Sequence, residues 1–124
     1  MTKQFLMAAA VGLLASSGAS AAIVAGWTMP TAVPAATTGS SYTYGAADVG
    51  DATAGTSLSA FHALAATTWS SPAGNGSTYS LSSNNWSVGD YYQVAVSTTG
   101  FTDIYLSWDQ TRSSTGPSVF DVQM

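Results

Sequence analysis

The chain has 124 residues, of which only 6% are charged, and its formal net charge is −4 at pH 7. This length fits a single domain, and the absence of cysteine excludes disulfides, thiol catalysis and cysteine-based metal sites. With two cations in the whole sequence, the composition also argues against binding to nucleic acid or to anionic lipid, both of which depend on clustered Lys and Arg.

The first 21 residues have the pattern of a secretory signal peptide. Lys3 precedes an apolar run at residues 5–14, and a patch of small residues ends in Ala19-Ser20-Ala21, an A-x-A cleavage site. The apolar run is about half as long as the ~20 residues that a membrane-spanning helix needs, which disfavours the alternative of a retained anchor. We therefore expect a helical bacterial signal peptide at 1–21, export by the Sec route, and a secreted or envelope-located mature chain with no membrane segment.

The first half of the mature chain gives weak strand signals. Residues 23–28, 62–69 and 79–81 read as strands, whereas residues 29–41 are rich in Pro, Ala, Thr and Gly and predict an irregular loop. Two Ala-rich stretches suit a helical turn, residues 45–54 and 57–66.

Alternation of apolar and polar residues predicts three strands in the last third of the chain, at residues 91–97, 104–109 and 119–124. Strands with one apolar and one polar face, joined by short Gly-containing turns, are typical of antiparallel sheets. We therefore predict an all-β domain at residues 22–124, an antiparallel β-sandwich of jelly-roll type. Because the alternation is unbroken at Met124, we expect the chain to end within a strand and the domain to be incomplete there, with an exposed sheet edge.

His62 is the only histidine, so Ser-His-Asp catalysis would have to use it. The serines are too numerous to single out a partner, and no G-x-S-x-G motif is present. We interpret His62 as structural and expect no enzyme activity. A His62 in a pocket within hydrogen-bond reach of a Ser and an Asp would favour the enzyme alternative. Paired carboxylates for glycoside hydrolysis are disfavoured, because glutamate is absent and each Asp lies beside a turn or on a wet strand face.

Two ligand hypotheses remain open. Asp48 and Asp51, together with nearby carbonyls, have the oxygen chemistry of a structural calcium site, although no EF-hand spacing is present. No other cofactor is expected. Exported β domains also bind sugars by stacking them on exposed rings, which requires two or more such rings on one surface. The candidates for this carbohydrate-binding alternative are Trp69, Trp86, Tyr91 and Tyr105.

Five segments carry a family resemblance: residues 71–77 (SPAGNGS), 82–93 (SSNNWSVGDYYQ), 96–101 (VSTTGF), 106–111 (LSWDQT) and 114–117 (STGP). Together they make the chain beyond the signal peptide resemble the recurrent exported domain of bacterial PEP-CTERM proteins. In that family further strands and a C-terminal sorting signal follow, and the 124 residues contain neither. The resemblance implies an exopolysaccharide-associated surface protein of a Gram-negative bacterium, with extracellular polysaccharide or envelope components as partners and no catalytic residues.

Overall fold

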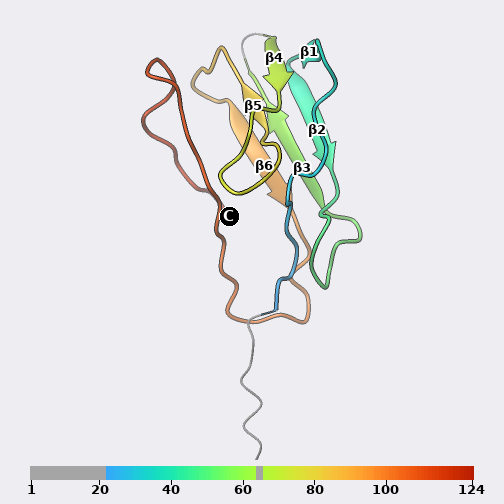
Figure 1. The fold of residues 1–124 in the computed structure, drawn as a ribbon. Helices are drawn as coiled ribbons and strands as arrows, with labels where there is room; N and C mark the ends of the chain where they lie inside the picture. The colour runs from blue at the N-terminus through green and yellow to red at the C-terminus, as the bar shows by residue number, and fades with distance from the viewer. Residues whose placement is uncertain (1–21, 64–65) are drawn as a thin grey trace, which may run out of the picture.

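The computed structural model describes residues 22–63 and 66–124, so the expected signal peptide at 1–21 lies outside the described residues. The described part contains strands and no helix, which confirms the prediction of an all-β chain with antiparallel pairing. Within it, no helix is long and apolar enough to span a membrane. The strands are β1 (Thr38–Gly39), β2 (Ser41–Gly45), β3 (Ser57–Phe61), β4 (Thr67–Ser70), β5 (Ser82–Ser83) and β6 (Tyr91–Ala95) (Figure 1).

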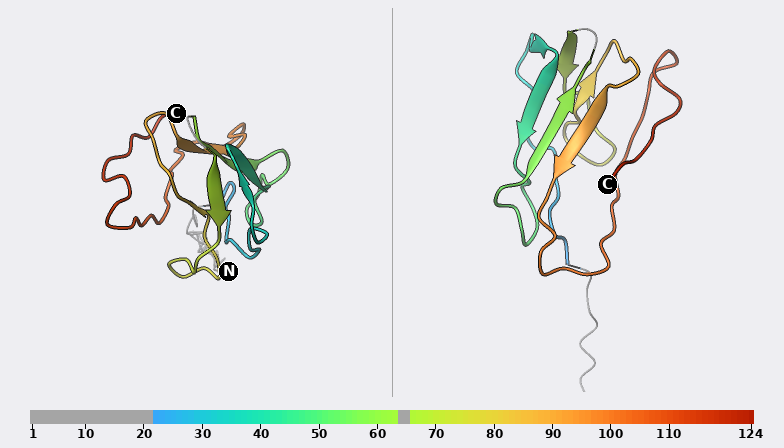
Figure 2. Two further views of the ribbon diagram at one scale, coloured as in Figure 1. Left: turned by 90° about the horizontal axis from the view of Figure 1, so that it is seen from above. Right: turned by 180° about the vertical axis from the view of Figure 1, so that it is seen from behind.

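The strands form two small antiparallel sheets, β1-β4-β5 and β2-β3-β6 (Figure 2). β3 and β6 pair without interruption, from Ser57 opposite Ala95 to Phe61 opposite Tyr91. The pairing of β2 with β3 is irregular, because the register shifts between Thr43 and the last residue of β2. The larger sheet therefore has one irregular edge strand, β2, and one regular edge strand, β6.

A small apolar core joins the two sheets. Trp69 of β4 is only 1% exposed and belongs to one cluster with Ala60 of β3 and with Val33. Tyr42 of β2 stacks on Trp69 with ring centroids 6.0 Å apart. Because Trp69 is the largest side chain in this cluster, its ring provides much of the apolar contact between the sheets.

The chain before β6 differs from the sequence prediction in several places. β1 and the first residue of β2 lie within residues 29–41, which were predicted as a loop, and residues 45–54 contain no helical turn. Residues 57–61 form β3 instead of a helical turn, because β2 and β6 pair with them on both sides. Residues 23–28 make a single isolated bridge, between Gly26 and Val49, rather than a strand.

The other two predicted strands of this part are shifted or missing. In the strand predicted at 62–69, residues 67–69 belong to β4, whereas residues 79–81 form no strand and lie just before β5. The local pattern there was too short to fix strand boundaries.

The strands predicted at residues 104–109 and 119–124 are wrong. Within the described part of the chain, these residues belong to no sheet and make no backbone hydrogen bond to one. They lie in an extended C-terminal segment beside the sheets (Figures 1 and 2). Alternation assigns side chains to two faces, but a strand also needs a neighbouring backbone, and the chain turns between β6 and this segment at Gly100 and Asp103, which both have positive φ.

Candidate functional site

His62 follows β3 directly, and its side chain is fully buried. Its ring meets the edge of Trp69 with centroids 5.2 Å apart and tilts against Trp86 at 4.9 Å. The imidazole is therefore held between two indoles, one that precedes β5 in the sequence and one that follows it. It extends the aromatic core toward the start of β6.

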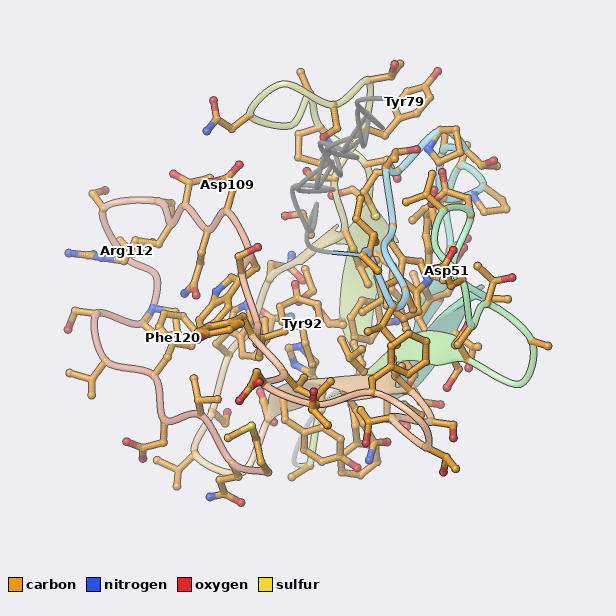
Figure 3. The ribbon with its side chains drawn as sticks, turned by 90° about the horizontal axis from the view of Figure 1, so that it is seen from below. Asp51, Tyr79, Tyr92, Asp109, Arg112 and Phe120 are labelled. Atoms are coloured by element: carbon orange, nitrogen blue, oxygen red, sulfur yellow. The ribbon has the colours of Figure 1, made fainter. Side chains whose placement is uncertain are left out.

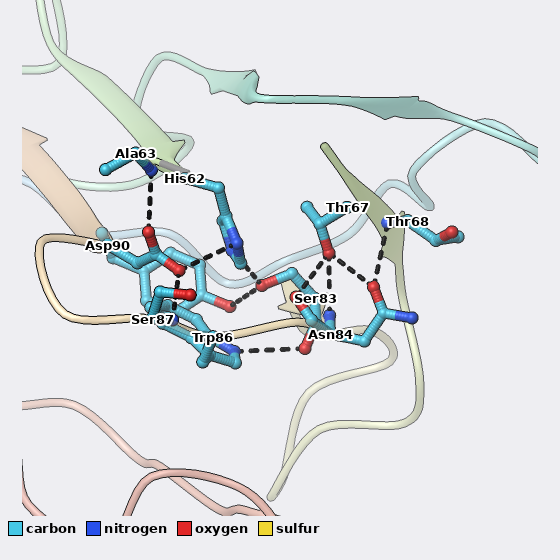
Figure 4. Close-up of polar contacts among 10 residues, drawn as sticks. His62, Ala63, Thr67, Thr68, Ser83, Asn84, Trp86, Ser87 and Asp90 are labelled. Carbon is cyan, nitrogen blue, oxygen red and sulfur yellow. Dashed lines mark hydrogen bonds and ion pairs between the residues drawn. The ribbon is translucent and has the colours of Figure 1, made fainter. Parts of the chain in front are cut away.

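Polar partners lie at both nitrogens of the His62 ring. Nε2 is 3.1 Å from Oγ of Ser83 in β5, and Nδ1 is 3.0 Å from Oδ2 of Asp90 (Figure 4). The Nδ1 contact has the length of an ion pair but not the angle of a hydrogen bond. The His62 ring thus lies between a serine hydroxyl and an aspartate carboxylate, as in a Ser-His-Asp arrangement. A Ser and an Asp within hydrogen-bond distance of His62 are what the enzyme alternative requires.

The Asp90 carboxylate, whose side chain is 1% exposed, does more than face His62. Its Oδ1 accepts a hydrogen bond of 2.8 Å from the backbone N–H of Ala63, and its Oδ2 accepts one of 2.6 Å from that of Ser87. The carboxylate therefore fixes the turn before β6 to the end of β3. The sequence placed Asp90 as an ordinary turn residue, which describes its backbone but misses these contacts.

The chemistry open to this arrangement is limited by burial. In acyl transfer the imidazole must pass its proton to the leaving group, so Nε2 has to reach the substrate. The His62 side chain has no exposed surface, and its Nε2 faces Ser83. The Ser83 hydroxyl is also 3.5 Å from the Tyr92 hydroxyl, and burial raises the pKa of Tyr92 while the hydrogen bond from Ser83 opposes this shift. We interpret the group, which we name the His62 cluster (His62, Ser83, Asp90), as a polar tie between segments.

A second polar tie joins β4 to the residue after β5. Thr67, which is 2% exposed, has its hydroxyl 2.5 Å from both the backbone carbonyl and the side-chain oxygen of Asn84, and donates to one of them at a time. The N–H of Asn84 donates back to the Thr67 hydroxyl, and the N–H of Thr68 donates to the Asn84 side chain (Figure 4). Sequence reasoning missed these partners. The only signal was the polar run 82–85, which could not be matched to Thr67 without knowing that β4 pairs with β5.

The two candidate calcium ligands, Asp48 and Asp51, have different surroundings. The carboxylate of Asp48 accepts hydrogen bonds from the backbone N–H and the hydroxyl of Thr28, and the hydroxyl contact lowers the pKa of Asp48 despite a small opposing effect of burial. Asp51 is exposed at the periphery (Figure 3). Among residues 22–63 and 66–124, no three His, Cys, Asp or Glu side chains gather in the way a metal site requires.

The four aromatic candidates for sugar stacking do not form one exposed platform. Trp69 is buried in the core, and Trp86 is half-buried against His62 and Tyr92. Tyr91 packs on Phe61, and the alternation of β6 puts it on the sheet face opposite Tyr92. Tyr105 is 92% exposed in the C-terminal segment.

A broad hollow of about 3630 Å³ lies between the sheets and the C-terminal segment. Tyr92 and Phe120 lie on its two sides, and both contact Trp86 (Figure 3). We give the name open face to seven of the apolar side chains that line it, each of which is 41% to 56% exposed: Tyr92, Val94, Ile104, Leu106, Trp108, Phe120 and Val122.

Charged side chains also border the hollow, since the residues that line it include Asp90, Asp103, Asp109, Arg112 and Asp121. Arg112 and Asp109 lie at the outer side of the C-terminal segment (Figure 3). Comparison with protein-family models, curated proteins and solved structures finds no match. Function is therefore inferred from the polar ties, the open face and the sequence of this chain.

Proposed function

We propose that the chain is an exported, non-enzymatic surface or extracellular-matrix protein of the PEP-CTERM type, built on an antiparallel β-sandwich of jelly-roll type. The observation that carries this proposal is how the chain uses its buried polar side chains. Asp90 and Thr67 each connect one sequence segment to another, and the only histidine is enclosed between two indoles. Polar groups used in this way stabilise a fold instead of converging on a substrate.

The surface composition supports the same role. Apart from six aspartates and, beyond the expected signal peptide, the single cation Arg112, the polar residues are uncharged and mostly Ser and Thr. A neutral, hydroxyl-rich surface suits contact with hydrated extracellular polysaccharide and lacks the charge that attracts nucleic acid. The narrower alternative, a carbohydrate-binding module that stacks sugars on several rings, gains no support from the placement of Trp69 and Trp86.

Export is tested by locating the protein and its N-terminus. The full chain, tagged at its C-terminus and expressed in a Gram-negative host, is expected outside the cytoplasm with Ala22 as its first residue. The variant Ala21→Phe, which removes the small residue before the cleavage site, is expected to keep its leader, whereas Ala25→Phe is processed normally. A cytoplasmic protein that still begins at Met1 would falsify the export part of the proposal.

A further inference from the structure

The regular edge of the larger sheet is β6, and its outer side is unpaired within the described part of the chain. An edge strand presents a row of free N–H and C=O groups that only another backbone can satisfy in full. Natural edges are protected by charge, proline or a bulge. β2 has such an irregularity in its register at Thr43, whereas β6, with the sequence Tyr-Tyr-Gln-Val-Ala, has none of these devices.

We propose that β6 pairs with β6 of a second copy of this chain, antiparallel about a two-fold axis at Gln93. This register uses all five residues of the strand. It puts Tyr92 opposite Val94 of the second copy, and Val94 opposite Tyr92, on the face that lines the hollow. Aromatic and β-branched residues are favourable cross-strand pairs, so the strand is complementary to itself in this register.

Charge permits this self-association despite the negative net charge of the chain. β6 contains no charged residue. The carboxylate nearest to β6 in the sequence is that of Asp90; its side chain is 1% exposed and is directed toward His62 and two backbone N–H groups, so it is withdrawn from the strand edge. A charged partner strand would find no opposite charge along β6, whereas a second β6 brings no repulsion.

The side chains of β6 are also accessible to a partner. All five residues of the strand are exposed, with Tyr91 at 46%, Tyr92 at 41% and Val94 at 46%. A second β6 that pairs along this edge would bring its own Tyr92 and Val94 beside them and cover part of this apolar surface.

The absence of cysteine makes a direct geometric test possible. Residues directly opposite each other in an antiparallel pair have Cα atoms about 4.5–5.5 Å apart, which is within the range that a disulfide spans. The variant Gln93→Cys, under mild oxidation, is therefore expected to form a covalent dimer. Val88→Cys, at a loop position that is 98% exposed, is the matched control and is expected to stay largely uncoupled.

Sedimentation velocity over a concentration series measures the association itself. The unmodified mature chain is expected to dimerise, and Val94→Lys is expected to weaken the dimer about tenfold or more because it places a charge on the paired edge. Val88→Lys adds the same charge away from β6 and is expected to leave the dimer unchanged. Circular dichroism checks that each variant is folded. A monomer at all concentrations, or a dimer in which position 93 does not cross-link, would overturn the proposal.

Discussion

Removing the carboxylate of Asp90 is expected to be the most destabilising polar substitution in the chain. Asp90→Ala leaves the backbone N–H groups of Ala63 and Ser87 without their acceptor and removes the carboxylate that faces Nδ1 of His62. Ala63 is exposed, so water can partly replace the carboxylate there, whereas the imidazole is fully buried and cannot be rehydrated without opening the core. The substitution thus removes three contacts and allows compensation at one.

The magnitude follows from these contacts. A hydrogen bond to a charged group contributes about 1.5–3 kcal/mol, and the Asp90 carboxylate accepts two of them. We therefore expect a loss of about 3–5 kcal/mol for Asp90→Ala, a large part of the ~5–15 kcal/mol that stabilises a typical domain. Asp90→Asn retains one carbonyl acceptor and is expected to lose about 1–3 kcal/mol.

Urea unfolding followed by tryptophan fluorescence measures both values, because Trp69 and Trp86 contact His62. Asp109→Ala is the matched control. Its carboxylate is exposed and makes no hydrogen bond or ion pair within the described part of the chain, so the expected change is within about 0.5 kcal/mol. A loss below about 1 kcal/mol for Asp90→Ala, or one equal to that of Asp109→Ala, would refute the interpretation of the His62 cluster as a tie.

Substitutions at Thr28, Trp69 and Gly50, two of them with a matched comparison variant, test other parts of the structure. Thr28→Val removes the hydroxyl that lowers the pKa of Asp48, so carboxyl NMR is expected to show this pKa rising toward 3.8. In the unmodified chain the contact stabilises the fold above pH 3.8 and this stabilisation is lost in acid; in the variant it is expected to be absent. An unchanged pKa contradicts the contact. Trp69→Ala is expected to lower the free energy of unfolding by about 3–5 kcal/mol. Trp69→Phe is expected to lower it much less, because the buried indole N–H has no hydrogen-bond partner in the described structure. Equal losses of stability for the two variants in thermal unfolding would rule this out. Gly50 has a φ of +117, and Gly50→Ala places a Cβ 2.6 Å from a backbone oxygen. Gly55 has a φ of +72, and a Cβ added there meets no atom within 4 Å. Gly50→Ala is therefore expected to lower the melting temperature more than Gly55→Ala, and the reverse order contradicts the backbone geometry.

The sequence predicts the chemistry of individual strands better than their pairing. β6 was predicted because Tyr92 and Val94 alternate with their neighbours. These two side chains share one face of the sheet, and Tyr92 lies opposite Ala60 of β3. Residues 104–109 alternate just as clearly, yet no strand of the described chain lies beside them. Alternation records which face of a segment is apolar, whereas pairing depends on a second segment that the local pattern does not contain.

The same distinction applies to the candidate site. The sequence led us to interpret His62 as structural, but Ser83 and Asp90 were not recognised as its partners because they lie 21 and 28 residues further along the chain. Their common location depends on the pairing of β4 with β5 and of β3 with β6. Trp69 was considered as a surface ring, and it is buried because it alternates inward in β4, a four-residue strand too short to show its phase from sequence.

The reactivity of Ser83 tests most directly the claim that the His62 cluster stabilises the fold and performs no chemistry. The folded mature chain is incubated with a fluorophosphonate, with trypsin as a positive control, and its intact mass is measured. We expect trypsin to be labelled and the chain to keep its mass, because the His62 ring that would have to activate and serve the nucleophile is fully buried. A fluorophosphonate adduct on Ser83 that is lost in His62→Gln would contradict this claim and identify the cluster as catalytic.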